Sequence, residues 1–569
     1  MQIIKSVRTL VLFLLPVYGM SQSSYLPLGS KDYLFLDRLE IKAATDPNLN
    51  FSSVRPFNRR LTTMAVEEMD SLIRANSPDA PTLTSIDQYN MERYLLANSE
   101  WAKPRPYFSS KKPLGAFYTN PANFYEVNTK DFFLAINPMI QYQYSKEKNN
   151  SQSLFYNSRG VSLRGMIGRK VGFDIYITDN QERDPLYVQQ FIDSRKAVPG
   201  ARFYKNFKAA GGVDYFDNRG SISINATKYI DIQFGYDKNF IGNGARSLLL
   251  SDFSGNALFL KLNTRIWKFN YENLFMELIP DALRAGGNSL LSRKYFRMNY
   301  LTLNATKWLN VGVFDAVMFG RKDRFDFQYM IPVLFLRPAE SDIGSKDNAM
   351  VGLTVKANVK KTVQLYGQLM LDEFKLSELK SNRGWWGNKY GYQLGVKYVD
   401  AFGIKNLDVQ LEDNRIRPFT FSHFDSVGSY THYNQPLAHP LGAGFQEYIG
   451  IVRYQPIKKL YIEAKLIRFK QGLDTSAASL GSNPSRPYTQ RPVNPVTNRP
   501  VEYGYSVGNG NQATVNNANL LVSYEVKENM FVDVNLQNRT FTPTKGTKTT
   551  TTVMSLGFRW NMARRNFDF

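Results

Sequence analysis

The sequence predicts an all-β protein: a transmembrane antiparallel outer-membrane β-barrel of about 18 strands, with a small N-terminal helical periplasmic domain. Three observations predict this fold. The first residues have the pattern of an export signal, most of the chain after residue 130 alternates between apolar and polar residues, and the connections between the alternating segments are short and long in turn. Short turns on one side and long loops on the other are typical of outer-membrane barrels.

Composition narrows the class of protein. The chain has 569 residues, a formal net charge of +22 and no cysteine, which excludes disulfides, thiol redox chemistry and zinc–thiolate sites. Aromatic residues make up 14% of the chain, while its mean hydropathy is only −0.36. So many aromatic residues at such low hydropathy fit neither a helical membrane protein nor a disordered chain.

The first expected element is a signal peptide over residues 1–21. Lys5 and Arg8 precede a short apolar block at 10–17, and small residues follow just before Gln22. A basic flank, an apolar block and small residues at the cleavage position, in this order, favour a signal peptide over a buried N-terminal strand. No run of about 18 apolar residues follows, so the sequence predicts an exported protein that is either soluble or a β-barrel.

Residues 22–125 form the expected helical periplasmic domain and linker. Apolar residues recur at helical spacing between 61 and 73, which predicts one helix. Ser85, followed three residues later by Gln88, has the pattern of a capping box and predicts the start of a second helix. The proline-containing stretch 101–114 is the expected linker.

The barrel is expected over residues 126–569. Apolar and polar residues alternate strictly in segments such as 351–360, 407–412 and 532–537. Because successive side chains of a strand point to opposite faces, each such strand has one apolar and one polar face. A half-exposed soluble sheet has the same pattern, so the length of the series carries the argument rather than any one strand.

The strand count follows from the connections. Eight short turns define 16 strands, and a lone strand at each end, at about 132–144 and 551–561, brings the total to 18. The eight turns are expected around residues 169–170, 227–228, 265–266, 306–307, 360–361, 403–404, 458–459 and 528–529. An even number returns both ends of the barrel to the short-turn side, which in these barrels is the periplasm.

Two segments depart from the regular pattern. Phe327–Leu336 alternates like a strand but contains Pro332, so we assign it to an extracellular loop. Near the C-terminus the apolar face of the last strand ends at Trp560, and the alternation changes after Met562. We expect a bulge or a short tail there. The final Phe569 resembles the aromatic signal by which outer-membrane assembly machinery recognises its clients.

A barrel of this size has room for a water-filled lumen, and the inward faces of its strands carry charge. The cations predicted to face inward are Arg164, Lys261, Arg265, Lys356 and Lys397, and the anions are Asp408, Glu412, Glu525 and Asp533. Clustered cations attract anions, so acidic polysaccharide, lipopolysaccharide phosphates and small anions are candidate partners. The alternative is that the basic residues lie beside lipid headgroups and in turns, and the sequence leaves both open.

Aromatic residues in a long loop are a second candidate site. Trp385 and Trp386 could stack on the apolar faces of sugar rings, or they could anchor the loop in the lipid interface. Combined with the cations, they give the predicted polysaccharide-binding set: Arg164, Arg246, Lys261, Arg265, Lys356, Trp385 and Trp386.

Catalytic signals are weak. The three histidines, His423, His432 and His439, fall in one long loop at spacings that match no compact pair of metal ligands. The glycine-rich run at 242–244 lacks the strand–turn–helix context of a nucleotide site. We therefore expect no enzyme activity, no cofactor, no metal and no nucleic-acid partner.

The run Tyr236–Phe253, with the sequence YDKNFIGNGARSLLLSDF, resembles the signature loop of the Wzi-type capsule-assembly family. It especially resembles the Bacteroidota branch known as gliding motility protein RemB, and the segments 25–29 and 430–440 are similar to the same branch. The resemblance covers most of the chain after residue 21. It implies an outer-membrane barrel with an N-terminal helical bundle at the periplasmic end. In this family the capsule members hold polysaccharide on the cell, and the RemB-like members are linked to gliding.

Three functions follow as hypotheses. The first is a non-enzymatic surface protein that binds or organises acidic extracellular polysaccharide and is surrounded by outer-membrane lipid. The second is a barrel that acts through gliding or secretion machinery proteins. The third is a porin-like channel, for which the open or plugged state of the lumen is decisive.

Overall fold

The computed structural model describes residues 23–44, 46, 48–109, 115–207, 211–280, 290–321, 324–332, 335–344 and 347–569. The expected signal peptide at 1–21 lies outside these residues. Among the helices of the described ranges, none is long and apolar enough to cross a membrane.

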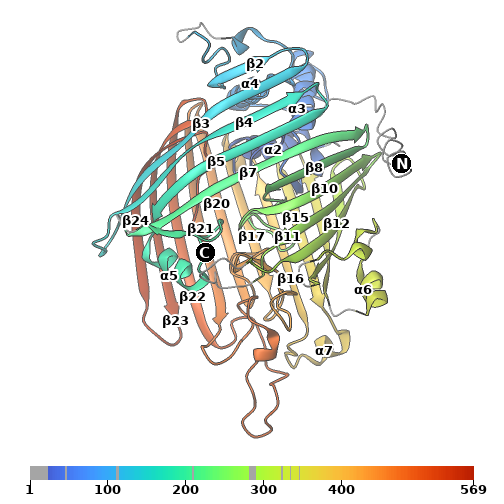
Figure 1. Cartoon of the computed structure of the whole chain (residues 1–569). Coiled ribbons are helices and arrows are strands. Elements are labelled where there is room, and N and C mark those ends of the chain that lie inside the picture. The colour runs from blue at the N-terminus through green and yellow to red at the C-terminus, as the bar shows by residue number, and fades with distance from the viewer. Residues whose placement is uncertain are drawn as a thin grey trace, which may run out of the picture.

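Eighteen strands of the described chain form a closed antiparallel barrel, as predicted (Figure 1). The ring closes where β24 pairs with β3, with Val553 opposite Glu147. The barrel strands are β3 (Phe132–Glu147), β4 (Leu154–Ile167), β5 (Val171–Arg183), β7 (Gly212–Thr227), β8 (Ile230–Asp237), β10 (Ala257–Ile266), β11 (Phe269–Leu278), β12 (Lys294–Asn304), β13 (Leu309–Phe319), β14 (Asn348–Val359), β15 (Val363–Glu373), β16 (Lys389–Tyr398), β17 (Leu407–Ile416), β20 (Phe445–Ile457), β21 (Leu460–Leu473), β22 (Asn511–Lys527), β23 (Met530–Pro543) and β24 (Thr549–Trp560). Two short strands, β2 (Tyr125–Asn128) and β6 (Lys205–Phe207), pair with β3 and β7 beside the ring.

The eight predicted short turns all join neighbouring strands of the ring, from the β4–β5 turn to the β22–β23 turn. We call the end of the barrel that carries them the short-turn end and the opposite end the long-loop end. The described residues of the segment 327–336 form no barrel strand: Phe327–Met330 is a 3-10 turn, and helix α6 (Arg337–Ile343) follows the segment. Its assignment to a long loop is confirmed.

The N-terminal region contributes helices α2 (Asp32–Ala43), α3 (Arg59–Arg74) and α4 (Ser85–Ala97). Helices α3 and α4 confirm the two predicted helices, but the capping box lies one residue earlier, between Thr84 and Asp87. Helix α2 was not predicted. Charged residues interrupt its apolar pattern, and the buried Glu40 and Lys42 show why: part of this helix faces a polar interior instead of an apolar core.

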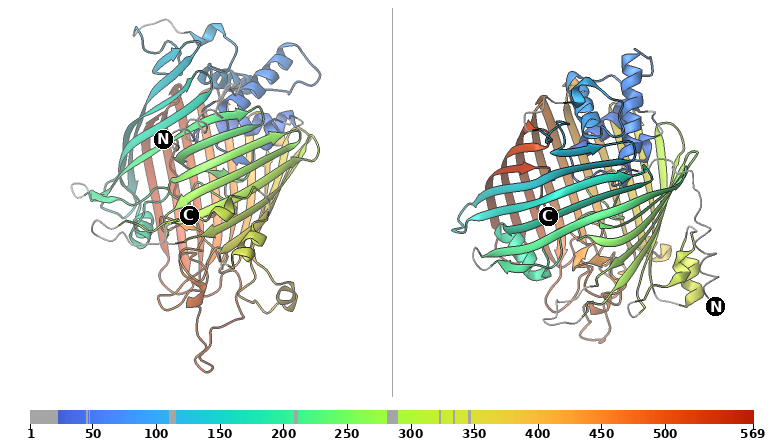
Figure 2. Two further views of the ribbon diagram at one scale, coloured as in Figure 1. Left: turned by 45° about the vertical axis from the view of Figure 1, so that its right-hand side comes forward. Right: turned by 45° about the horizontal axis from the view of Figure 1, so that its top comes forward.

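The helices lie at the short-turn end, and α2 reaches into the barrel (Figure 2). Their own apolar core contains Leu36, Val66 and Leu95, all nearly inaccessible to solvent. Strand β1 (Val54–Arg55) leaves this domain and pairs with β9 (Phe240–Ile241) of a loop inside the barrel. The helical region is therefore joined to the barrel interior by backbone pairing as well as by side chains.

The outer face of the barrel is apolar. Leu353, Leu394, Leu466 and Leu556 project outward from four strands and are 52–65% exposed. Aromatic side chains stand at the short turns, where Trp267 is 76% exposed. An apolar belt bordered by aromatic residues is the surface that a bilayer requires of a transmembrane barrel.

The interior is filled from both ends. A large apolar cluster of loop and strand residues occupies the long-loop half, with Leu248–Leu250 and Tyr430 among its members. After β24 the chain turns back into the barrel as a C-terminal tail, which we define as residues 561–569 (Figure 1). Of the two arrangements expected after Met562, the structure has the tail.

Candidate functional site

The inward-facing cations predicted from the sequence bind the N-terminal region. Each contacts a residue between positions 25 and 100, in the following pairs: Arg164 with Glu100, Lys261 with the ring of Tyr25, Arg265 with the ring of Phe51, Lys356 with Glu40, and Lys397 with Asp37. These five cations join the barrel wall to the helical domain within it. Their predicted role in polysaccharide binding stays a prediction.

Lys356 is the most enclosed of these contacts. Its Nζ lies 2.6 Å from the Glu40 carboxylate, 2.6 Å from the Asn50 carbonyl oxygen and 2.7 Å from Ser52 Oγ. Both charged side chains are 2% exposed. All three ammonium donors thus have acceptors, which is the condition under which a buried ion pair is tolerated.

The predicted inward anions are also engaged. Asp408 binds Arg38 of α2, and Glu525 binds Lys31 just before it. Asp533 pairs with Arg559 of the neighbouring strand at 2.6 Å. The carboxylate of Glu412 instead accepts backbone N–H bonds from Ala245 at 2.7 Å and from Arg246 at 3.1 Å.

Glu412 thereby holds the loop that contains most of the run 236–253, which resembles the signature loop of the Wzi-type family. This loop, residues 238–256, folds inward: Phe240 and Ile241 pair with β1, and Leu248 is fully buried. The run is therefore part of the interior of the barrel and lies between the helical domain and the long loops.

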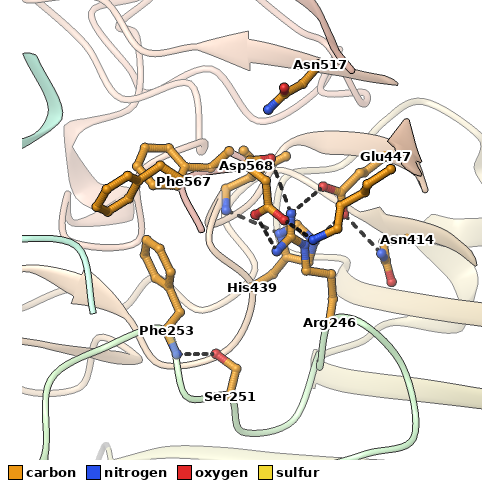
Figure 3. Close-up of polar contacts among 12 residues, drawn as sticks. Arg246, Ser251, Phe253, Asn414, His439, Glu447, Asn517, Phe567 and Asp568 are labelled. Carbon is orange, nitrogen blue, oxygen red and sulfur yellow. Dashed lines mark hydrogen bonds and ion pairs between the residues drawn. The ribbon is translucent and has the colours of Figure 1, made fainter. Parts of the chain in front are cut away.

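Arg246 is the centre of a buried charged cluster inside the barrel (Figure 3). Its guanidinium lies 2.9 Å from Asp568 of the tail and 3.3 Å from Glu447. His439 Nε2 is 2.7 Å from the same Glu447, and Lys465 is 3.0 Å from Asp568. Burial opposes ionisation of Asp568, but Arg246 and Lys465 together hold the pKa of its carboxyl well below the usual range. The tail is thus held by a carboxylate that stays charged.

Further contacts fix the tail on its other side. Arg565 pairs with Glu182 at 2.6 Å and donates to the carbonyl oxygen of Pro199 at 2.9 Å. Tyr187, from helix α5 (Leu186–Arg195), donates its hydroxyl to the carbonyl oxygen of Phe567 at 2.5 Å. The change of alternation after Met562 predicts an irregular element here, but nothing in the local pattern indicates where that element folds.

The two tryptophans predicted as a sugar platform lie in a loop cluster at the long-loop end. We define this loop cluster by Trp385, Trp386, Tyr488 and Arg491. The rings of Trp386 and Tyr488 are 4.7 Å apart, and the Arg491 guanidinium lies 3.7 Å above the Trp386 ring. Both tryptophans are partly exposed. The structure therefore brings the predicted pair together with a third ring and a cation from a distant part of the chain.

The three histidines occupy separate places. His432 accepts a bond from the Ile279 N–H at Nδ1 and donates from Nε2 to the Asn256 carbonyl oxygen, and burial lowers its pKa to about 4. His423 contacts Asp425, and His439 contacts Glu447. Among the residues that the structure describes, no three His, Cys, Asp or Glu side chains are grouped so that they could hold a metal ion.

The closed antiparallel ring and its apolar belt define an outer-membrane β-barrel, and the protein resides in the cell outer membrane. Its interior is occupied by helices, loops and a tail. The comparisons with known proteins agree at the level of the fold.

The chain is similar to the solved structure of Wzi from Escherichia coli, with a TM-score of 0.56 and 12% identity over 95% of this chain and 100% of that one. That protein is described as an outer-membrane protein involved in group 1 capsule assembly and as a carbohydrate-binding β-barrel. OprD of Pseudomonas aeruginosa matches with a TM-score of 0.41 and 11% identity, covering 75% of this chain and 94% of its own. Vanillate-bound OpdK of the same organism matches with a TM-score of 0.42 and 9% identity, covering 75% of this chain and 98% of its own. The chain matches no protein-family model and no curated protein.

Proposed function

We propose that this protein is a non-enzymatic outer-membrane barrel that binds or organises acidic extracellular polysaccharide at the cell surface. The observation that carries the proposal is the loop cluster of aromatic and cationic side chains, on a fold similar to that of a carbohydrate-binding barrel. The resemblance of the 236–253 run to the Wzi-type family and to its RemB branch supports the same proposal.

In this proposal the long-loop end faces the outside of the cell, and the helical domain faces the periplasm. The loop cluster then lies where a surface polysaccharide would first meet the protein. Aromatic rings stack on the C–H faces of sugars, and a guanidinium binds a sugar carboxylate through paired N–H donors. Arg491 is buried and paired with Glu502 at 2.9 Å, so it holds the Trp386 ring in place, and the cation for a sugar carboxylate has to come from an exposed neighbour. Arg383 adds a cation near the cluster, with its side chain 58% exposed and its guanidinium 4.1 Å from the ring centre of Tyr503.

The test compares Trp386→Ala with wild type in binding to acidic surface polysaccharide from the host, with purified protein at low salt. We expect wild type to bind and the variant to bind more weakly. Wild-type protein that binds no surface polysaccharide would refute the proposal.

A deletion strain of the host separates polysaccharide retention from motility. If polysaccharide is made but released from the cells, the protein is a retention factor. If the surface coat is intact but colony spreading fails, the protein acts in gliding or secretion through protein partners.

The filled interior of the barrel argues against the alternative that the protein is a porin. The tail is pinned by Arg246 and Arg565, and helix α2 is bound to the wall at the other end. We expect wild-type protein to be nearly silent in planar bilayers. The double variant Arg565→Ala, Asp568→Ala, which removes the tail's ion pairs with Glu182, Arg246 and Lys465 but keeps Phe569, should give a resolvable conductance. A large open conductance of wild-type protein would instead favour a channel.

A further inference from the structure

An open groove lies on the outer, lipid-facing wall of the barrel, between β16 and β23. Its volume is about 770 Å³, which is in the range of ligand sites in proteins. Across its floor, Gly450 of β20 lies between Leu411 of β17 and Leu466 of β21. Ala518 of β22 is the next residue in this row. The two leucines are 53% and 65% exposed, so the small residues beside them leave a channel in the apolar belt. We call this channel the wall groove.

Three cations face outward at the end of the wall groove that points towards the long loops. They are Arg415 of β17 and Arg468 and Lys470 of β21, and all three are exposed. In the register of the sheet, Gln446 of β20 lies opposite Arg415 on one side and opposite Lys470 on the other. Strands are about 4.8 Å apart and rise about 3.4 Å per residue, so the three backbone positions lie within about 12 Å of one another. A ligand with more than one anionic group can therefore contact all three.

These cations have few counter-ions in the protein. The side chains of Arg468 and Lys470 form no hydrogen bond or ion pair with any residue within the described ranges. One carboxylate, that of Asp413, lies near Arg415 on the same strand, which leaves an excess of positive charge. Elsewhere on the outer wall, the exposed Arg159 is paired with a carboxylate of the neighbouring strand at 3.2 Å. A charge that faces lipid without a partner is destabilising, so the anion for Arg468 and Lys470 is expected from the membrane.

The height of the cations on the wall matches that of lipid headgroups. The outward positions of β21 are apolar from Leu460, at the short turn, to Leu466, and Arg468 and Lys470 follow. At about 3.3 Å per residue and a strand tilt of about 40°, Lys470 stands about 25 Å above Leu460, which is the height of the apolar band of such barrels. The cations therefore lie at headgroup depth in the leaflet at the long-loop end, and the floor of the wall groove lies among the acyl chains.

A neutral amide stands beside the cations. Asn516 of β22 lies opposite Arg468 and is exposed, and its side chain forms no hydrogen bond with the described residues. An amide both donates to and accepts from hydroxyl groups. Phosphates, sugar hydroxyls and acyl chains occur together in the glycolipid of the outer leaflet, lipopolysaccharide, whose headgroup is a phosphorylated sugar.

We infer that the wall groove binds the phosphorylated glycolipid of the outer leaflet. An acyl chain lies over Gly450, and the phosphates contact Arg468, Lys470 and Arg415. Asn516 binds a hydroxyl group of the same headgroup. The inference goes beyond the proposed function and shares with it only the orientation of the barrel, with the long-loop end outside.

The experiment uses purified full-length protein in detergent and fluorescently labelled lipid A that carries its phosphates. Lipid A without phosphates and phosphatidylglycerol are the comparison lipids, and affinities are measured by fluorescence. The double variant Arg468→Gln, Lys470→Gln removes the two unpaired cations. The matched control is Lys146→Gln, Lys148→Gln, because both lysines are exposed at the long-loop end of β3, outside the wall groove.

A third variant, Gly450→Leu, tests the floor of the wall groove. A Cβ added at Gly450 would have Leu411 Cδ2 as its nearest neighbour, at 3.6 Å, so the backbone accepts a side chain there. The added leucine fills the channel and leaves all three cations in place. Heat-modified migration in gels checks that each variant is a folded barrel.

We expect wild type and the control to bind lipid A equally, and the Arg468, Lys470 double variant to bind it at least about tenfold more weakly, because charge-assisted bonds to phosphate are lost. Gly450→Leu should also bind lipid A more weakly, and wild type should prefer lipid A with its phosphates to both comparison lipids. Equal losses in the double variant and the control, unchanged affinity of the double variant or of Gly450→Leu, or equal binding of the three lipids by wild type would overturn the inference. Trp386→Ala should bind lipid A as wild type does, so failure of this inference leaves the loop cluster and the proposed function untouched.

Discussion

The two halves of the barrel interior are filled by different chemistry. At the short-turn end, charged side chains of the wall are paired with charged side chains of the helical domain, as in Lys356–Glu40 and Lys397–Asp37. In the long-loop half, a buried apolar cluster that includes Leu248 and Tyr430 lies beside the charged residues that hold the tail. The comparison shows that charge in the lumen fixes the helical domain at one end and the C-terminal tail at the other, whereas apolar packing fills much of the rest of the long-loop half. Three predictions test this contrast, from the largest expected effect to the smallest.

The largest effect is expected at the short-turn end. Lys356→Met leaves Glu40 charged and buried without its partner, which costs about 3–5 kcal/mol of unfolding free energy. Urea unfolding of the barrel in lipid vesicles measures the loss. The double variant Lys356→Met, Glu40→Gln should recover much of it, because no charge then remains buried. A loss below about 1 kcal/mol would mean that the pair is hydrated and comparable to a surface pair.

The second effect is a selective response of the long-loop half to acid. His432 is neutral in the folded protein, with its pKa lowered by burial to about 4 from 6.5. A lowered histidine pKa leaves stability intact above pH 6.5 and removes it as the pH falls towards 4. The full shift corresponds to about 3 kcal/mol. The added proton would occupy Nδ1, which accepts the Ile279 N–H, so protonation also breaks that bond.

Hydrogen exchange locates this response. Between pH 7 and pH 4.5, exchange in the segment 421–440 should rise, while helix α2 stays protected. Burial raises the pKa of Asp37, but the nearby Lys397 lowers it further, so the net pKa is below the usual value. Asp37 therefore stays ionised at pH 4.5, and its ion pair with Lys397 persists. His432→Gln should remove most of the pH dependence. Equal loosening of both halves would contradict the contrast.

The third effect concerns ligand binding at the long-loop end. Trp386→Ala removes the ring that Tyr488 and Arg491 pack against. Truncation of a central tryptophan costs about 2 kcal/mol of binding free energy, which is about thirtyfold in affinity for polysaccharide. Trp267→Ala is the matched control, since Trp267 is exposed at a short turn at the other end. Equal affinity of wild type and Trp386→Ala would exclude the loop cluster as a binding site.

Much of the barrel could be predicted from local pattern. The outward position of Leu353, Leu466 and Leu556 follows from alternation with a period of two, because a bilayer admits only apolar side chains on that face. The short turns and the loop assignment of 327–336 follow from the same periodicity and from proline. The sequence predicts only part of the loop cluster. Trp385 and Trp386 stand out as aromatic residues in a long loop, but Tyr488 and Arg491 come from a loop about a hundred residues away, and local pattern does not connect the two loops.

The sequence by itself determined the barrel, its strand number and the side of each strand that faces lipid, because these depend on the period of the side chains and on the solvent outside. Only the tertiary structure decided what fills the lumen. Whether Lys356 meets water, a sugar or Glu40 depends on a helix more than 300 residues earlier in the chain, and Arg246 meets Asp568 only because the tail turns back into the barrel. Polar residues are admitted on the inner face whatever they contact, so alternation alone cannot distinguish an anchor for a helix from a binding site for a ligand.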